Sequence, residues 1–158
     1  MLVSTHRHFF YVITFRIFSF EHMKETIKSK TLRQQATFSC SPLELYEILM
    51  NSKKHGEITG GKAKISNKIP GQFEVFDGYV HGYNIELVPG KKIIQAWHFS
   101  EDGWPEDHFS ICTFQLNKIK GGTKLIFTQK GIPIHKYTSL QEGWKQYYWE
   151  SLKRYLLK

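Results

Sequence analysis

Residues 138–158 read TSLQEGWKQYYWESLKRYLLK, and they decide the fold of this 158-residue chain. Apolar side chains recur there at intervals of three, four and one, which gathers them on one stripe of an α-helix. We expect Ser139 to cap this helix and Glu142 to complete a capping box. Such a broad apolar face has to be covered by another part of the chain. The stripe consists of Leu140, Trp144, Tyr147, Tyr148, Leu152, Tyr155 and Leu156.

Most of the preceding chain has the alternation of β-strands. Residues 31–39 alternate between apolar and polar side chains, which predicts a first strand. Ser41 and Pro42 are suited to begin a short helix that ends at Met50, and residues 51–61 are expected to form a loop. Asp77-Gly78 is the strongest hairpin signal that follows. Further strands are expected at residues 62–67, 72–76, 79–88, 92–99, 108–117 and 123–130.

This order of elements predicts an α+β fold of the helix-grip type. A curved antiparallel sheet is expected to wrap around the long C-terminal helix, with one short helix after the first strand. Where the sheet and the helix do not close fully, an apolar pocket is left between them. The length of the chain suits one domain with a core of its own, and we place that domain at residues 23–158.

The composition limits which binding partners and which cellular compartment are expected. The formal net charge is +8, but the lysines are scattered and no arginine-rich or RNA-binding motif accompanies them, so no nucleic-acid partner is expected. A basic surface is either simply solvated or attracts an acidic partner. The two cysteines, Cys40 and Cys112, form neither a disulfide framework nor a paired zinc motif. This cysteine usage indicates a reducing compartment, and we expect a cytoplasmic protein.

Residues 1–22 differ in character from the rest of the chain. Their apolar run is interrupted by Arg16 and is too short and too charged to cross a bilayer as a helix, so no membrane association is expected. We interpret these residues as an N-terminal extension. It is either an untranslated stretch before Met23 or a targeting segment.

Several motifs together indicate a family. They are Phe76-Asp77-Gly78-Tyr79-Val80-His81-Gly82, Leu87-Val88-Pro89, Ile93-Ile94 with Trp97 and Phe99, Trp104-Pro105-Glu106-Asp107-His108-Phe109, Gly122-Thr123-Lys124-Leu125, Lys130-Gly131-Ile132-Pro133 and Glu142-Gly143-Trp144-Lys145-Gln146-Tyr147-Tyr148. In order and spacing, the chain from about Thr31 to Lys158 resembles the C-terminal domain of the activator of heat shock protein 90 ATPase. That domain belongs to the START-like (Bet v 1-like, SRPBCC) superfamily.

The resemblance implies a function. The leading hypothesis is a non-catalytic, co-chaperone-like domain that binds heat shock protein 90 and modulates its ATPase. The full-length eukaryotic activator also carries an N-terminal domain, so we expect binding here through the C-terminal-type domain alone. The alternative is a START-like cavity that binds a small hydrophobic ligand or lipid, and a cyclase-like enzyme is the third possibility.

Two groups of residues are candidate binding sites. Six rings are expected between the sheet and the helix, where they either pack solidly or line a cavity: Trp97, Phe99, Phe114, Phe127, Trp144 and Tyr148. Trp104, Pro105 and Glu106 lie in a loop between strands, where Trp104 either anchors a partner or folds back over the end of the sheet.

We expect neither a catalytic site nor a metal site in this chain. The eight histidines include no H-x-x-x-H pair or histidine–carboxylate spacing of a metal site, and we assign no cofactor. Enzymatic activity would require an acid or base inside the pocket, for which Glu74, Glu86 and His81 are the candidates. We expect a protein that is not an enzyme.

Overall fold

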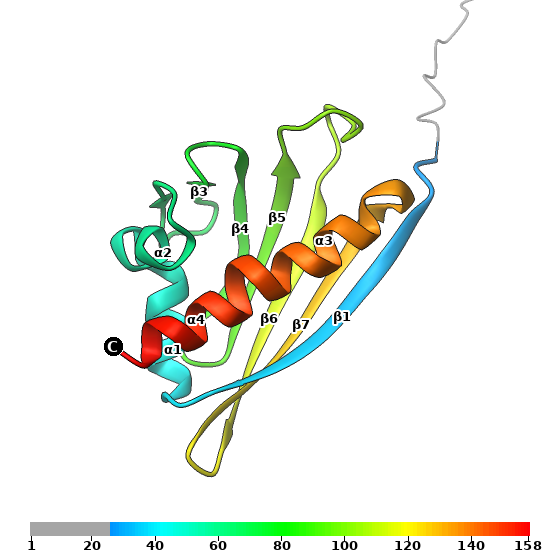
Figure 1. The fold of residues 1–158 in the computed structure, drawn as a ribbon. Coiled ribbons are helices and arrows are strands. Elements are labelled where there is room, and N and C mark those ends of the chain that lie inside the picture. The colour runs from blue at the N-terminus through cyan, green and yellow to red at the C-terminus, as the bar shows by residue number, and fades with distance from the viewer. Residues whose placement is uncertain (1–25) are drawn as a thin grey trace, which may run out of the picture.

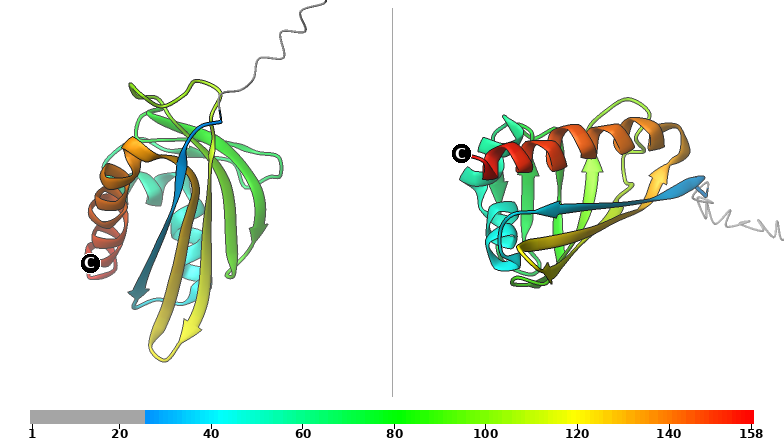
Figure 2. Two further views of the ribbon diagram at one scale, coloured as in Figure 1. Left: turned by 90° about the vertical axis from the view of Figure 1, so that its right-hand side faces the viewer. Right: turned by 60° about the horizontal axis from the view of Figure 1, so that its bottom comes forward.

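The structure is a computed structural model that describes residues 26–158, and the predicted N-terminal extension lies outside the described residues. Seven antiparallel strands form one sheet in the order β1-β7-β6-β5-β4-β3-β2. The sheet curves around the C-terminal helix, which lies against its concave face (Figure 1). Figure 2 shows the same arrangement from two further sides. The α+β helix-grip prediction is therefore confirmed. The strands are β1 (Ser29–Phe38), β2 (Lys64–Ile65), β3 (Gln72–Val75), β4 (Val80–Val88), β5 (Lys92–Phe99), β6 (Ser110–Ile119) and β7 (Gly122–Pro133).

Two helices, rather than the single predicted one, follow β1. Helix α1 (Pro42–Met50) begins as expected, and the Ser41 hydroxyl accepts a hydrogen bond from the Glu44 backbone N–H at 3.1 Å. The loop predicted for residues 51–61 is wrong, because helix α2 (Ser52–Thr59) occupies most of it. Asn51 caps α2 by accepting from the Lys54 N–H at 3.0 Å, and Gly60 ends it in the left-handed conformation at φ 79°.

The C-terminal helix is continuous but changes its winding. It comprises the 3-10 turn η1 (Ile134–Lys136), α3 (Tyr137–Gly143), the π-helical segment η2 (Trp144–Trp149) and α4 (Glu150–Leu156). The predicted cap at Ser139 is wrong, because the chain is already helical before it and Ser139 lies within α3.

The π-helical segment widens the buried face of the helix. Trp149 lies outside the predicted stripe, yet its side chain is only 4% exposed. Wider winding rotates the following residues relative to a 3.6-residue period, so Trp149 joins Trp144 and Tyr148 on the buried face. Tyr147, which the period placed in the stripe, remains half exposed.

Glutamine side chains accept hydrogen bonds from the indole N–H groups of three buried tryptophans. Trp144 and Trp149 of the helix donate their indole N–H groups to the side-chain oxygens of Gln129 and Gln34, at 2.7 and 2.6 Å. Trp97 of β5 donates to Gln95 at 3.0 Å. A buried indole N–H without an acceptor is costly. Two of these bonds also fix where the helix lies on the sheet.

Candidate functional site

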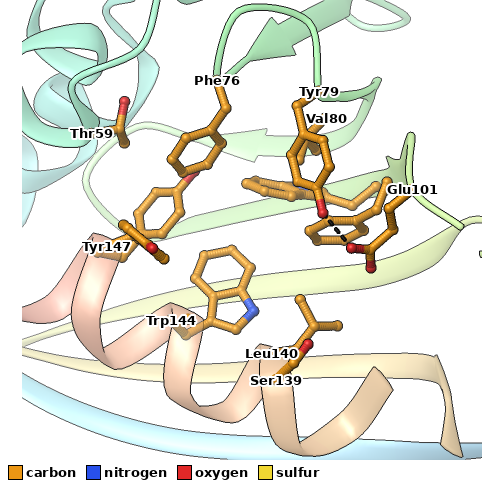
Figure 3. A pocket seen from close by; sticks show the side chains of 13 residues that line it. Thr59, Phe76, Tyr79, Val80, Glu101, Ser139, Leu140, Trp144 and Tyr147 are labelled. Carbon is orange, nitrogen blue, oxygen red and sulfur yellow. Dashed lines mark hydrogen bonds between the residues drawn. The ribbon is translucent and has the colours of Figure 1, made fainter. Parts of the chain in front are cut away.

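A pocket of about 460 Å³ opens between the C-terminal helix and the β3–β5 side of the sheet; we call it the helix pocket (Figure 3). Its volume falls in the range of sites that hold small organic ligands. Seven of its thirteen lining residues are aromatic, and one carries a formal charge. The lining residues are Thr59, Phe76, Tyr79, Val80, Trp97, Phe99, Glu101, Ser139, Leu140, Gly143, Trp144, Tyr147 and Tyr148.

The six predicted rings divide between the pocket and the solid core. Those that line the helix pocket are Trp97, Phe99, Trp144 and Tyr148. Phe127 lies beneath it, with ring centroids 4.2 Å from Trp144 and 5.1 Å from Phe114. The two arrangements left open for these rings therefore occur side by side. The helix is hydrogen-bonded to β7 and β1 through Trp144 and Trp149, and it stands away from the β3–β5 side of the sheet, where the pocket opens.

The turn between β3 and β4 supplies two pocket residues that the sequence prediction missed. Phe76 and Tyr79 extend from this turn toward the helix (Figure 3). The turn is made by Phe76, Asp77 and Gly78, which have positive φ angles of 54°, 57° and 86°. The Asp77-Gly78 pair signalled a hairpin, but its placement opposite the helix comes from tertiary structure.

The polar part of the pocket is a linked group at its mouth. The Tyr79 hydroxyl donates to the Glu101 carboxylate at 2.5 Å, and the Lys136 ammonium lies 3.4 Å from the other oxygen of that carboxylate. Burial and the adjacent Glu101 raise the pKa of the Tyr79 hydroxyl, so it remains a donor at neutral pH. Glu101 therefore connects the β3–β4 turn to the start of the C-terminal helix.

A histidine lies behind the pocket wall. His55 of α2 is 4% exposed, and its Nε2 lies 3.0 Å from the Tyr148 hydroxyl, with which it shares a hydrogen bond. Burial lowers the pKa of His55 to about 4 and raises that of Tyr148. Both groups are therefore neutral at pH 7, and His55 acts there as a structural partner of Tyr148.

The acid and base candidates for an enzymatic pocket do not line it. Glu74 and His81 are exposed and directly opposite each other on β3 and β4, while Glu86 pairs with Lys92 at 2.8 Å. Strand alternation directs Glu74 and His81 away from the helix. The register of β4 shifts between Asn84 and Glu86, so Glu86 does not continue the buried face that ends at Asn84. The suggestion that these three side chains enter the pocket is therefore corrected. Within residues 26–158, no group of three His, Cys, Asp or Glu side chains could hold a metal ion.

The loop between β5 and β6 contains the predicted partner-binding residues. Trp104 is 5% exposed, with its ring 4.7 Å from that of Phe99, and its indole N–H donates to the His108 carbonyl at 2.9 Å. Of the two arrangements considered, the structure shows the ring folded over the end of the sheet. Glu106 is exposed and Pro105 is half-buried, so these two carry the outer surface of the loop.

The fold and the pocket define the class: a helix-grip domain with an apolar, aromatic-lined pocket under its C-terminal helix. Sequence comparison gives the family. The family described as "Activator of Hsp90 ATPase homolog 1-like protein" matches residues 39–157, and the chain belongs to this family. Among the described residues, no helix has the length and apolar character needed to span a membrane.

Named relatives cover most of this chain but only part of their own length. The human "Activator of 90 kDa heat shock protein ATPase homolog 1" is 34% identical over 118 residues, which span 75% of this chain and 34% of that protein. A Dictyostelium discoideum homologue is 34% identical over 121 residues, spanning 75% of this chain and 30% of that protein. The crystal structure of an HSP90 activator from Plasmodium falciparum has a TM-score of 0.73 at 24% identity, covering 80% of this chain and 95% of that chain. The structural likeness supports the fold.

Proposed function

We propose that this chain binds heat shock protein 90 as a co-chaperone-like domain in the cytoplasm, modulates its ATPase and has no catalytic activity of its own. Family membership over residues 39–157 is the observation that carries this proposal. The chain spans about a third of the length of the curated relatives that it matches, so it corresponds to one part of those activators.

The distribution of charge supports a contact with heat shock protein 90 at the basic surface around α2. Residues 53–68 contain five lysines and a single acidic residue, Glu57. Lys53 and Lys62 line the same shallow hollow beside α2, and both side chains are exposed. An exposed basic surface accelerates association with an acidic partner, and this attraction weakens with salt. The outer residues of the β5–β6 loop, Pro105 and Glu106, are a second proposed contact, with Trp104 holding the loop from beneath.

Charge reversal tests this location. The double variant Lys53→Glu/Lys62→Glu should reduce capture of purified heat shock protein 90 by the full chain about tenfold, because each substitution replaces attraction by repulsion. The control Lys118→Glu/Lys120→Glu makes the same change of net charge at the exposed hairpin between β6 and β7. Equal losses in both variants would show non-specific attraction and count against the proposed contact.

The helix pocket supports a second candidate function, the binding of a small apolar ligand. A pocket of about 460 Å³ with seven rings is large enough to bury such a molecule. The uncharged dye N-phenyl-1-naphthylamine should become fluorescent on binding to the full chain and lose that signal when the pocket is filled by Gly143→Leu. Unchanged fluorescence in the filled variant would place the dye elsewhere and remove the support for this function.

A further inference from the structure

The charge at the mouth of the helix pocket selects among ligands. Glu101 is the one formally charged residue among the thirteen that line the pocket. The others are apolar, aromatic or hydroxyl-bearing, and none of these lining residues is basic. An anionic head group placed here would meet the carboxylate, whose cationic partner Lys136 does not itself line the pocket. The lining therefore disfavours a fatty acid or any other anionic amphiphile.

We infer that the helix pocket binds a molecule with a flat, apolar, preferably aromatic body and a protonated amine, and that the amine contacts Glu101. This inference rests on the second proposed function, ligand binding in the pocket, and specifies its ligand class. Trp97, Trp144 and Tyr148 provide aromatic walls for the body of the ligand. Aromatic rings also attract a cation through their electron-rich faces, in addition to the ion pair with a carboxylate.

The present partners of Glu101 leave room for this contact. Its carboxylate is joined to Lys136 across 3.4 Å, longer than a close ion pair, and both side chains keep some solvent exposure. Tyr79 occupies one carboxylate oxygen through its hydroxyl. Lys136 does not line the helix pocket, whereas Glu101 does. A ligand amine would therefore approach Glu101 from the pocket side and compete with Lys136 for the same charge.

Gly143 provides a way to fill the pocket without disturbing its walls. It lies in α3 at the pocket lining, and a Cβ added there would meet only the Tyr147 ring, at 3.9 Å. A leucine at this position gains helix propensity and directs its side chain toward the space that a ligand would occupy. Gly143→Leu is thus a blocked form of the pocket that is expected to fold. Gln146→Leu adds a similar apolar side chain at an exposed helix position that does not line the pocket.

Three compounds with one ring system test the head-group preference by titration calorimetry on the full chain at pH 7. They are 2-naphthylmethylamine, 2-naphthylmethanol and 2-naphthoate, which carry a cationic, a neutral and an anionic head group. The amine should bind about fivefold more tightly than the alcohol, and 2-naphthoate should bind most weakly or not at all. Gly143→Leu should abolish binding of the amine and the alcohol, while Gln146→Leu should leave both unchanged.

Variants of the two charged residues at the pocket mouth should change the preference for the amine over the alcohol in opposite directions. Glu101→Gln keeps an acceptor for Tyr79 but removes the charge, so the amine and the alcohol should bind equally. Lys136→Gln removes the competing cation, so the affinity for the amine should rise about threefold while that for the alcohol stays the same. Asp107→Asn, in the same loop but outside the pocket, should change neither affinity.

The possible failures are distinguishable. Equal binding of all three compounds, unaffected by Glu101→Gln and Lys136→Gln, would overturn the amine inference and leave an apolar ligand pocket. Tighter binding of 2-naphthoate than of the amine would overturn it as well. No binding of any compound, together with no N-phenyl-1-naphthylamine signal, would overturn both the inference and ligand binding in the pocket.

Discussion

Trp144 donates its indole N–H to the side-chain oxygen of Gln129 at 2.7 Å, which joins the C-terminal helix to strand β7. Gln129 is fully buried, and its side-chain nitrogen donates in turn to the Ser110 hydroxyl at 2.8 Å on the neighbouring strand. This bond lies where the helix closes on the sheet, and Trp144 is also a wall of the helix pocket. The same ring therefore links the packing of the core to the shape of the pocket.

Replacing Gln129 by leucine should destabilise the protein. The substitution leaves the buried Trp144 N–H without an acceptor, and the expected loss in the free energy of unfolding is about 1–3 kcal/mol. Urea denaturation measures it. Gln35→Leu makes the same change at an exposed position of β1 and should cost less than about 0.5 kcal/mol. Equal stability of the two variants would contradict the role assigned to Gln129.

The buried His55 should make stability fall in mild acid. Its pKa is about 4 in the folded protein, against an ordinary value of 6.5, because burial disfavours the charged imidazolium. Between these values the unfolded chain binds the proton first. The contribution to stability is therefore complete above pH 6.5 and is lost as the pH falls toward 4, by about 3 kcal/mol in all. Denaturant titrations at several pH values would follow this loss.

His55→Phe isolates that effect. The variant should be less stable at pH 7, because the Tyr148 hydroxyl loses its 3.0 Å partner. Its stability should nevertheless change less between pH 6.5 and pH 4 than that of the unaltered protein. An unaltered slope in His55→Phe would show that other groups bind the proton.

Gly143→Ala should stabilise the protein. Gly143 is the last residue of α3 and has a helical φ of −61°, and the added methyl group meets nothing closer than 3.9 Å. The expected gain is about 0.5–1 kcal/mol, seen as a rise in Tm. By contrast, a Cβ on Gly82 would clash with the Ala96 carbonyl oxygen on the neighbouring strand, so Gly82→Ala should unfold the sheet. A Gly143→Ala variant of lower Tm would contradict the open space described there.

Trp104→Ala should loosen the β5–β6 loop. The ring covers Phe99 and holds the His108 carbonyl, so its removal should cost about 3 kcal/mol of unfolding free energy and speed hydrogen exchange across residues 100–108. Pro105→Ala, which leaves the ring in place, should have a much smaller effect on both measurements. Unchanged exchange in Trp104→Ala would mean that the ring does not hold the loop.

The arrangement of sheet and helix could be predicted because it depends on periodicity. Residues two apart in a strand share one face, and Ile93, Gln95, Trp97 and Phe99 of β5 are all buried. Helix α2 was missed because only His55 and Ile58 of its eight residues are buried, which leaves no apolar stripe to detect. Asn51 and Gly60, which cap its two ends, were the available signals.

The candidate site was harder to predict than the fold. Alternation identified rings that face the helix, but it does not say where the helix touches the sheet and where it stands away. Phe127 and Tyr148 were both predicted to lie between the sheet and the helix. In the structure Phe127 packs against Trp144 in the core, whereas Tyr148 lines the pocket. Tyr79 and Glu101 come from separate turns, and only the tertiary structure brings their side chains together.

The most direct test of the central claim is titration calorimetry of the full chain against purified heat shock protein 90, at low and at physiological salt. We predict saturable binding in the micromolar range or tighter that weakens as salt rises, and a clear loss of affinity in Lys53→Glu/Lys62→Glu. Absence of binding at either salt concentration, with a chaperone preparation that hydrolyses ATP, would contradict the proposed function.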